Sequence, residues 1–97
     1  MPLYVTLYKF TDQGRRTIKD SPKRVRTIVA AVEKQGAKVH QVLYTTGQYD
    51  MVVVSEAPND QTALAIGLTT TSAGNVSAET LHAYTVDEME KIVSKLP

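Results

Sequence analysis

An amphipathic helix predicted over residues 21–36 constrains the fold of this chain more than any other segment. Its apolar residues recur at the spacing i, i+3, i+4 and i+7, which places them in one stripe along a helix: Val25, Ile28, Val29 and Val32. Ser21 can cap its start, Pro22 suits the first helical position, and Gly36 favours a left-handed C-terminal stop. Because such a stripe must be buried against another layer, the rest of the chain has to supply that layer.

Four further segments are rich in β-branched and aromatic residues, a composition typical of β-strands: residues 3–10, 38–46, 49–56 and 78–84. A second helix is predicted from Asn59, which can cap it, to about Thr71. A third begins after Thr85, which has the spacing of a capping box with Glu88. The order β-α-β-β-α-β with an extra C-terminal helix predicts a ferredoxin-like α+β fold, an antiparallel sheet with helices on one face, as one domain over residues 1–97.

Composition and charge exclude several classes of protein. Hydrophobic residues make up 42% and charged residues 22% of the 97 residues, which is typical of a globular protein rather than a disordered one. The net charge of +1 gives no electrostatic reason to expect nucleic acid or a membrane as a partner. Without cysteine there is no disulfide, no thiolate nucleophile and no cysteine-based zinc site. No secretory signal and no apolar run of membrane-spanning length is visible, so we expect a cytoplasmic protein.

Side chains alternate across a strand, so each predicted strand presents two sets of residues. In the first strand the two sets are Leu3, Val5 and Leu7 on one face and Tyr4, Thr6, Tyr8 and Phe10 on the other. The second and fourth strands repeat this division between an aliphatic face and a face rich in Tyr, His and Thr. We expect the aliphatic face to lie under the helices, because it matches the apolar stripe of residues 21–36.

The aromatic face would then be uncovered, and an uncovered face with aromatic rings and polar tips is typical of an interface or a ligand site. We therefore predict a homodimer or a higher homo-oligomer in which two sheets pair face to face and enclose a partly polar cavity. A small aromatic or hydrophobic molecule bound there would contact Tyr8, Tyr44, Tyr49, His82 and Tyr84. The alternative is that these rings pack against the partner sheet and no ligand binds.

The stretch "GQYD" at residues 47–50 connects two predicted strands. Gly47 and Gln48 are expected to form a tight two-residue hairpin of the type II′ class, because glycine accepts a positive φ without steric cost. Alternation then places Tyr49 and Asp50 on opposite faces of the sheet.

With this order of elements, "GQYD" resembles the motif of the GYD-domain family, carried here by Gly47, Tyr49 and Asp50. The resemblance covers nearly the whole chain, through "TDQG" (11–14), "DSPKR" (20–24), "TTGQYDMVVVSEAP" (45–58) and "GNVSAETLHAYT" (74–85). It implies a fold similar to the dimeric α+β barrels and so favours the sheet-to-sheet dimer. It implies no particular chemistry, because the family is described as uncharacterised and these barrels host unrelated functions.

Two residues are candidates for proton transfer. Asp50 would act as a base if its carboxylate faced a cavity; the alternative is that it accepts backbone N–H bonds and fixes the hairpin. His82, on the aromatic face, is the candidate general acid–base. His40 and His82 are expected on the two edge strands, too far apart in one subunit to share a metal, so we expect no metal site and no cofactor.

Three functions are compatible with these features. The first is a small cytoplasmic homo-oligomer that binds a small aromatic or hydrophobic molecule between paired sheets. The second is a cofactor-free enzyme of the monooxygenase or isomerase type found on similar folds, with Asp50 and His82 transferring protons. The third is a ligand-sensing or scaffold domain without catalysis.

Overall fold

The computed structural model describes all 97 residues of the chain, in four β-strands, four α-helices and one short 3-10 helix. In chain order these are β1 (Leu3–Phe10), α1 (Asp12–Arg16), the 3-10 helix (Ile18–Asp20), α2 (Ser21–Lys34), β2 (Lys38–Tyr44), β3 (Met51–Glu56), α3 (Asp60–Thr71), β4 (Val76–Ala83) and α4 (Val86–Val93). The predicted order of strands and main helices is therefore confirmed.

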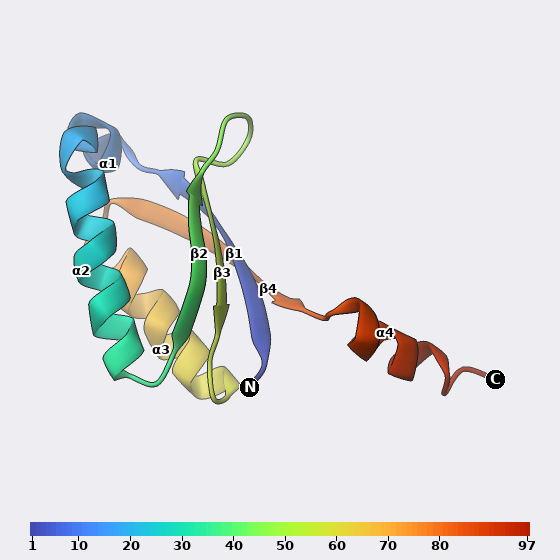
Figure 1. The fold of residues 1–97 in the computed structure, drawn as a ribbon. Helices are drawn as coiled ribbons and strands as arrows, with labels where there is room; N and C mark the ends of the chain where they lie inside the picture. The colour runs from blue at the N-terminus through green and yellow to red at the C-terminus, as the bar shows by residue number, and fades with distance from the viewer.

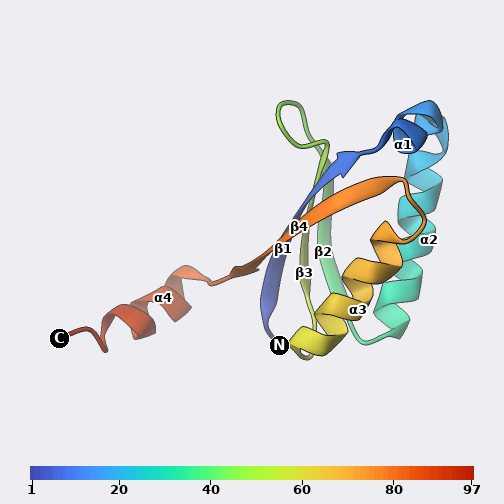
Figure 2. The ribbon, with the colours of Figure 1, turned by 180° about the vertical axis from the view of Figure 1, so that it is seen from behind.

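The strands form one antiparallel sheet in the order β2-β3-β1-β4, so β1 and β3 are the central strands. Helices α2 and α3 lie over one face of this sheet, and the opposite face has no covering helix (Figure 1). The view from behind shows the same two layers, with α4 apart from both (Figure 2). This arrangement is the ferredoxin-like α+β fold that the sequence predicts.

The two faces of the sheet are exchanged relative to the sequence prediction. Tyr4, Thr6 and Tyr8 are buried on the side of α2 and α3, with 6%, 8% and 8% of their surface exposed. The aliphatic residues that alternate with them therefore point away from the helices. The prediction was wrong because alternation separates two sets of residues without saying which set the helices cover. A tyrosine is buried at little cost where a helix offers its hydroxyl a partner, and Asp60 does so for Tyr4.

Helix α2 has the predicted stop but not the predicted cap. Pro22 lies in its first turn and Gly36 follows its end with a φ of 101°. Ser21, however, lies inside the helix, where its buried hydroxyl is 2.8 Å from the hydroxyl of Tyr44. Its side chain therefore joins α2 to the edge strand β2 instead of capping the helix.

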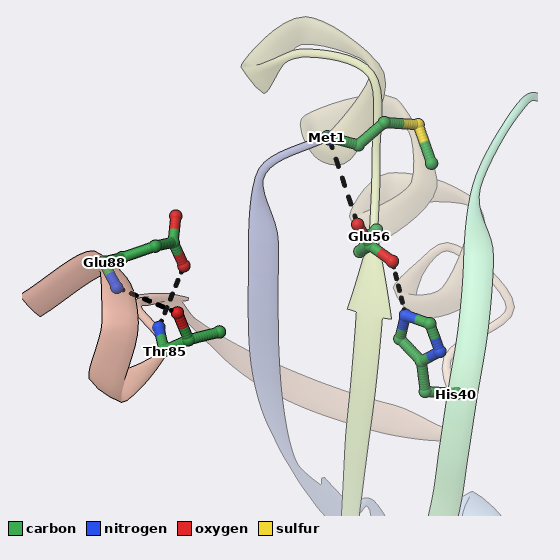
Figure 3. A network of polar contacts seen from close by, with 5 residues as sticks. All are labelled: Met1, His40, Glu56, Thr85 and Glu88. Carbon is green, nitrogen blue, oxygen red and sulfur yellow. Dashed lines mark hydrogen bonds and ion pairs between the residues drawn. The ribbon is translucent and has the colours of Figure 1, made fainter.

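The predicted N-caps of α3 and α4 are present. Asn59 Oδ1 accepts a hydrogen bond from the N–H of Thr62 at 2.8 Å. In α4, Thr85 Oγ1 accepts from the N–H of Glu88 at 3.1 Å, and Glu88 Oε1 accepts from the N–H of Thr85 at 2.9 Å (Figure 3). This backbone hydrogen bond to its carboxylate holds the pKa of Glu88 below its usual value.

The connection between β2 and β3 is longer than the predicted two-residue hairpin. The strands end at Tyr44 and resume at Met51, so residues 45–50 form the loop. Gly47 has the positive φ that was predicted, 101°. Thr45 closes the loop, because its N–H donates to Asp50 O at 2.9 Å and its hydroxyl donates to Tyr49 O at 2.6 Å. This side-chain bond to the backbone takes the place of further strand pairing near the glycine.

Two loops are joined at the end of the sheet where β1 leaves it. Thr11 N–H donates to Asn75 O at 3.0 Å, and its hydroxyl donates to Gly74 O at 2.6 Å. Gln13 adds a bond to Asn75 Oδ1 at 3.0 Å. Gly14 permits the contact, since a Cβ at this position would lie 2.1 Å from Asn75 O. The "TDQG" segment thus fastens the start of β4 to the end of β1.

Candidate functional site

The face of the sheet without helices, here called the open sheet face, is largely aliphatic, with Gln41 opposite Val54 and Glu79 opposite Leu7 as polar members. Val5 lies opposite Val54 on one side and Leu81 on the other, and Val52 lies between Leu7 and Leu43. Leu43 and Leu81 are 48% and 44% exposed. The full set is Leu3, Val5, Leu7, Leu43, Val52, Val54, Leu81 and Ala83. A contiguous apolar patch on a small domain is typical of an interaction surface.

Polar side chains border the open sheet face near the loop of residues 45–50. The Tyr49 hydroxyl donates to Glu79 Oε2 at 2.9 Å, and Lys9 Nζ lies 5.4 Å from the centre of the Tyr49 ring. The bond from the phenol to the carboxylate raises the pKa of Tyr49. Because β1 lies between β3 and β4, Tyr49 fastens the loop across the central strand to the edge of the sheet.

At the other end of the open sheet face, Glu56 joins three segments of the chain. His40 Nε2 lies 2.5 Å from Glu56 Oε2, and the amino group of Met1 lies 3.9 Å from Glu56 Oε1 (Figure 3). The hydrogen bond with His40 lowers the pKa of Glu56. His40 occupies the position where the register between β2 and β3 shifts, and its ring is engaged with this carboxylate.

A second apolar surface lies on the covered side of the sheet, between the strands and helices α2 and α3. It encloses a cavity of about 420 Å³, lined mainly by apolar residues of both layers, with Lys23 and Arg24 among the polar ones. Only 10 of the 97 residues are buried, so this cavity leaves the interior of one protomer incompletely packed. The predicted stripe of α2 faces it, as do Tyr4, Tyr8 and Met51 from the sheet.

The five residues predicted to bind a ligand do not converge on one site. Tyr8 lines the cavity under the helices, where burial raises the pKa of its phenol. Tyr44 contacts Ser21, and Tyr49 lies at the border of the open sheet face. His82 and Tyr84 stack with ring centres 4.9 Å apart, and Tyr4 adds a tilted contact to His82 at 5.1 Å. Their role in binding stays a prediction.

Asp50 and His82 lie near opposite ends of β1. Asp50 Oδ2 accepts from the N–H of Phe10 at 2.8 Å and its own N–H donates to Tyr8 O at 2.8 Å, whereas His82 pairs with Tyr4. Four to six strand residues separate these contacts, or roughly 13–20 Å at about 3.3 Å per residue. One protomer therefore does not bring both side chains to one reacting atom. The Asp50 carboxylate accepts a backbone N–H from β1 and so joins the loop of residues 45–50 to that strand; its fixing of the hairpin and proton transfer by either residue stay predictions.

His40 on β2 and His82 on β4 lie on the two edge strands, as the sequence predicts. No group of three or more His, Asp or Glu side chains is arranged to hold a metal ion. No helix combines the length and the hydrophobicity that a membrane span requires.

Sequence reasoning missed two residues that tie these surfaces together, Asp60 and Glu79, and it assigned Ser21 to a helix cap rather than to its contact with Tyr44. Asp60 is an ordinary acidic residue in the first turn of a helix. Its partner Tyr4 lies 56 positions away in the chain, so no local sequence pattern predicts their contact. Glu79 left a usable signal, because it is the one charged residue within β4. A carboxylate at a position of the aliphatic set needs a nearby polar partner, which Tyr49 supplies.

Comparison with known proteins gives a family match over most of the chain. The GYD domain model matches residues 4–93. A "Glutamine synthetase and cystathionine beta-lyase binding protein" of Thermus thermophilus is 31% identical over 90 residues, which are 92% of this chain and 95% of that protein. No solved structure shows a significant match.

Proposed function

Because this chain belongs to the GYD domain family, whose relative above is named for the enzymes it binds, we propose that it is a homodimeric protein-binding module. The observation that carries the proposal is the open sheet face, where Val5, Val54 and Leu81 form an aliphatic row without cover. Two copies would pair their open faces, about 10 Å apart, as packed sheets do.

The energetics favour such a pairing. Each aliphatic side chain of the open sheet face is already part-covered by its neighbours, so a partner sheet would contribute about 1 kcal/mol per side chain. Eight such residues on each of two copies amount to on the order of 10–20 kcal/mol, which is comparable to or larger than the entropic cost of association. The borders, with Lys9 and Glu79 at one end and Glu56 with His40 at the other, supply both signs of charge for a polar rim.

Light scattering coupled to gel filtration tests the dimer. Wild-type protein should elute at twice the 10.7 kDa chain mass, whereas Val54→Asp should be monomeric because it places a charge in the middle of the apolar patch. Ala30→Asp, which adds the same charge to an exposed position of α2, is the matched control and should remain dimeric. Wild-type protein that is monomeric at every concentration would rule the dimer out.

The relative's name supplies the first partners to test, glutamine synthetase and cystathionine β-lyase. We expect the immobilised protein to bind at least one of these enzymes, purified from its own host, in biolayer interferometry. Binding that Val54→Asp abolishes and Ala30→Asp preserves would show that the dimer is the binding form. No binding of either enzyme at micromolar concentration would refute these partners and leave the dimer standing. The cytoplasmic location expected from the sequence belongs to the same proposal, and cell fractionation tests it.

The cavity favours a second candidate, a binding protein for a small aromatic or hydrophobic molecule. Its volume of about 420 Å³ falls in the range of small-molecule sites, and its lining includes Tyr8. The molecule would lie between sheet and helices rather than between paired sheets, and Tyr44, Tyr49, His82 and Tyr84 are not among the residues that line this cavity. Native mass spectrometry of protein from its own host should then show a retained mass that Ile66→Trp, which fills the cavity, removes. A clean protein mass, with no thermal shift across apolar compounds, would count against this candidate.

A further inference from the structure

Helix α4 carries an apolar stripe with no partner in its own protomer. Every residue of α4 is exposed, and its apolar residues Val86, Met89 and Val93 recur at i, i+3 and i+7, with exposures of 84%, 52% and 47%. Leu96 extends the stripe and is 65% exposed. Both views show α4 apart from the sheet and from the other helices (Figures 1 and 2).

The same chain has an apolar groove with nothing to fill it. Helices α2 and α3 lie over the same face of the sheet, and residues of both line the cavity described above. Gly67 of α3 lines this space, and a Cβ added there would meet no atom within 4 Å. An amphipathic helix is the usual occupant of a groove of this kind.

The charges of the two elements are complementary. Helix α2 has four basic residues and one acid: Lys23, Arg24, Arg26, Lys34 and Glu33. Helix α4 has three acids and one base: Asp87, Glu88, Glu90 and Lys91. Since Lys23 and Arg24 line the cavity, an α4 in the groove would bring its acidic side chains toward basic ones.

The length of α4 adds a third argument. It has eight residues, and helices shorter than about 12–15 residues are marginal in water without tertiary contacts. Its capping box supports only the first turn. A helix this short therefore needs a surface against which to pack.

The position of α4 selects a second copy as the source of that surface. Helix α4 leaves the end of β4 and lies on the side of the open sheet face, whereas its own α2 and α3 lie beyond its own sheet (Figure 1). A partner paired through the open face would lie where α4 already points. Residues 85–96, about 18 Å long at 1.5 Å per residue, exceed the roughly 10 Å spacing of two packed sheets, so α4 can pass the edge of the partner's sheet toward its helix layer.

We propose that α4 of each copy packs its apolar stripe into the groove between α2 and α3 of a second copy, which makes the dimer an exchange of C-terminal helices. This inference rests on the proposed homodimer. The groove would then be filled by the partner's Met89 and its neighbours, and not by a small molecule.

Cysteine cross-linking tests the contact cleanly, because the chain has no cysteine of its own. Met89→Cys in α4 and Thr27→Cys, an exposed residue that lines the groove from α2, are made in separate chains, one of them with an affinity tag. After mixing and mild oxidation, the mixed disulfide dimer should form. Lys91→Cys, about half a turn away on the polar side of α4, is the matched control and should give little of it when paired with Thr27→Cys.

Each outcome of the cross-linking experiment supports or refutes the exchange of helices. Equal cross-linking by Met89→Cys and Lys91→Cys would overturn the proposal, because it indicates random collision. A double variant that carries both Met89→Cys and Thr27→Cys is also oxidised in the presence of excess wild-type protein. A disulfide within one of its chains would overturn the proposal, because it would show that α4 folds back onto the groove of its own protomer. Absence of any cross-link in a protein that light scattering shows to be dimeric would refute the exchange and leave the proposed function intact, whereas a wild-type monomer would refute both.

A dye measurement reports on the groove itself. Met89→Asp should release α4 and increase the fluorescence of the apolar dye ANS, while Lys91→Asp should leave it at the wild-type level. Unchanged fluorescence in Met89→Asp would mean that α4 does not cover the groove. Bound dye already at saturation in wild-type protein would mean that the groove is open to a small molecule instead.

Discussion

Tyr4 and Asp60 are joined by a 2.6 Å hydrogen bond from the phenol to the carboxylate, which ties the central strand β1 to the first turn of α3. This contact belongs to the covered face of the sheet, and it leaves the aliphatic set of β1 on the open side. The polar tip of one aromatic residue thus helps to decide which surface remains available for a partner.

Removal of this hydrogen bond should destabilise the fold measurably. Tyr4→Phe keeps the buried ring and loses the bond to a charged acceptor, so we expect the free energy of unfolding to fall by about 1.5 kcal/mol in urea denaturation. Tyr84→Phe is the control: its ring is 56% exposed and its hydroxyl makes no hydrogen bond in the chain, so the change should stay below about 0.5 kcal/mol. Equal effects of the two variants would contradict the assigned role.

The same contact predicts a stability that depends on alkaline pH. Asp60 and burial together raise the pKa of Tyr4 to about 12, from 10.0. A group whose pKa is raised in the folded state stabilises it fully below the unfolded pKa, and that contribution is lost as pH rises from 10 toward 12. The difference in unfolding free energy between wild type and Tyr4→Phe should therefore shrink by about 1.4 kcal/mol between pH 8 and 11. A difference that stays constant over this range would refute the assignment.

The order of elements could be predicted from the sequence because each of the three main helices has a local start or stop signal. Pro22 and Gly36 frame α2, Asn59 caps α3, and Thr85 with Glu88 caps α4. The choice of covered face could not be read, because it depends on pairs such as Tyr4 with Asp60 that lie far apart in the chain. The predicted ligand site depended on which face the helices cover. Because that prediction was wrong, the tyrosines expected in one cavity are dispersed over both sides and one end of the sheet.

The hydrogen bonds of Asp50 give a test of its structural role. Asp50→Ala leaves the N–H of Phe10 without its acceptor, so we expect a loss of about 1–2 kcal/mol in unfolding free energy and faster exchange of the Phe10 amide by NMR. Asp50→Asn keeps an acceptor oxygen and should cost less. If both variants were as stable as wild type with unchanged Phe10 exchange, the structural role would be wrong and the proton-transfer alternative would gain weight.

Two glycines should respond in opposite directions to the same added methyl group. Gly14→Ala places a Cβ against the carbonyl oxygen of Asn75, so it should destabilise the protein by about 1–3 kcal/mol through the displaced loop. Gly67 lies in the interior of α3, and a Cβ added there meets no other atom of the protomer within 4 Å. Since alanine favours a helix more than glycine does, Gly67→Ala should be neutral or should stabilise the protein by up to about 1 kcal/mol. Thermal unfolding of both variants measures the difference, and a Gly14→Ala protein as stable as Gly67→Ala would contradict the close contact with Asn75.

The capping box of α4 should make this helix sensitive to acid. The bond that Glu88 accepts from the N–H of Thr85 lowers the pKa of Glu88 below its ordinary value of 4.5. The bond therefore stabilises α4 fully above pH 4.5, and this stabilisation is lost as the pH falls through the pKa that Glu88 has in the folded protein. We expect the helical chemical shifts of α4 to decline in wild-type protein as the pH falls below 4.5. Glu88→Gln keeps an acceptor without a titrating group, and it should show no such decline. Thr85→Ala, which loses the other half of the box, should lower the helicity of α4 already at neutral pH. An equal acid response in wild type and Glu88→Gln would mean that the cap does not control this helix.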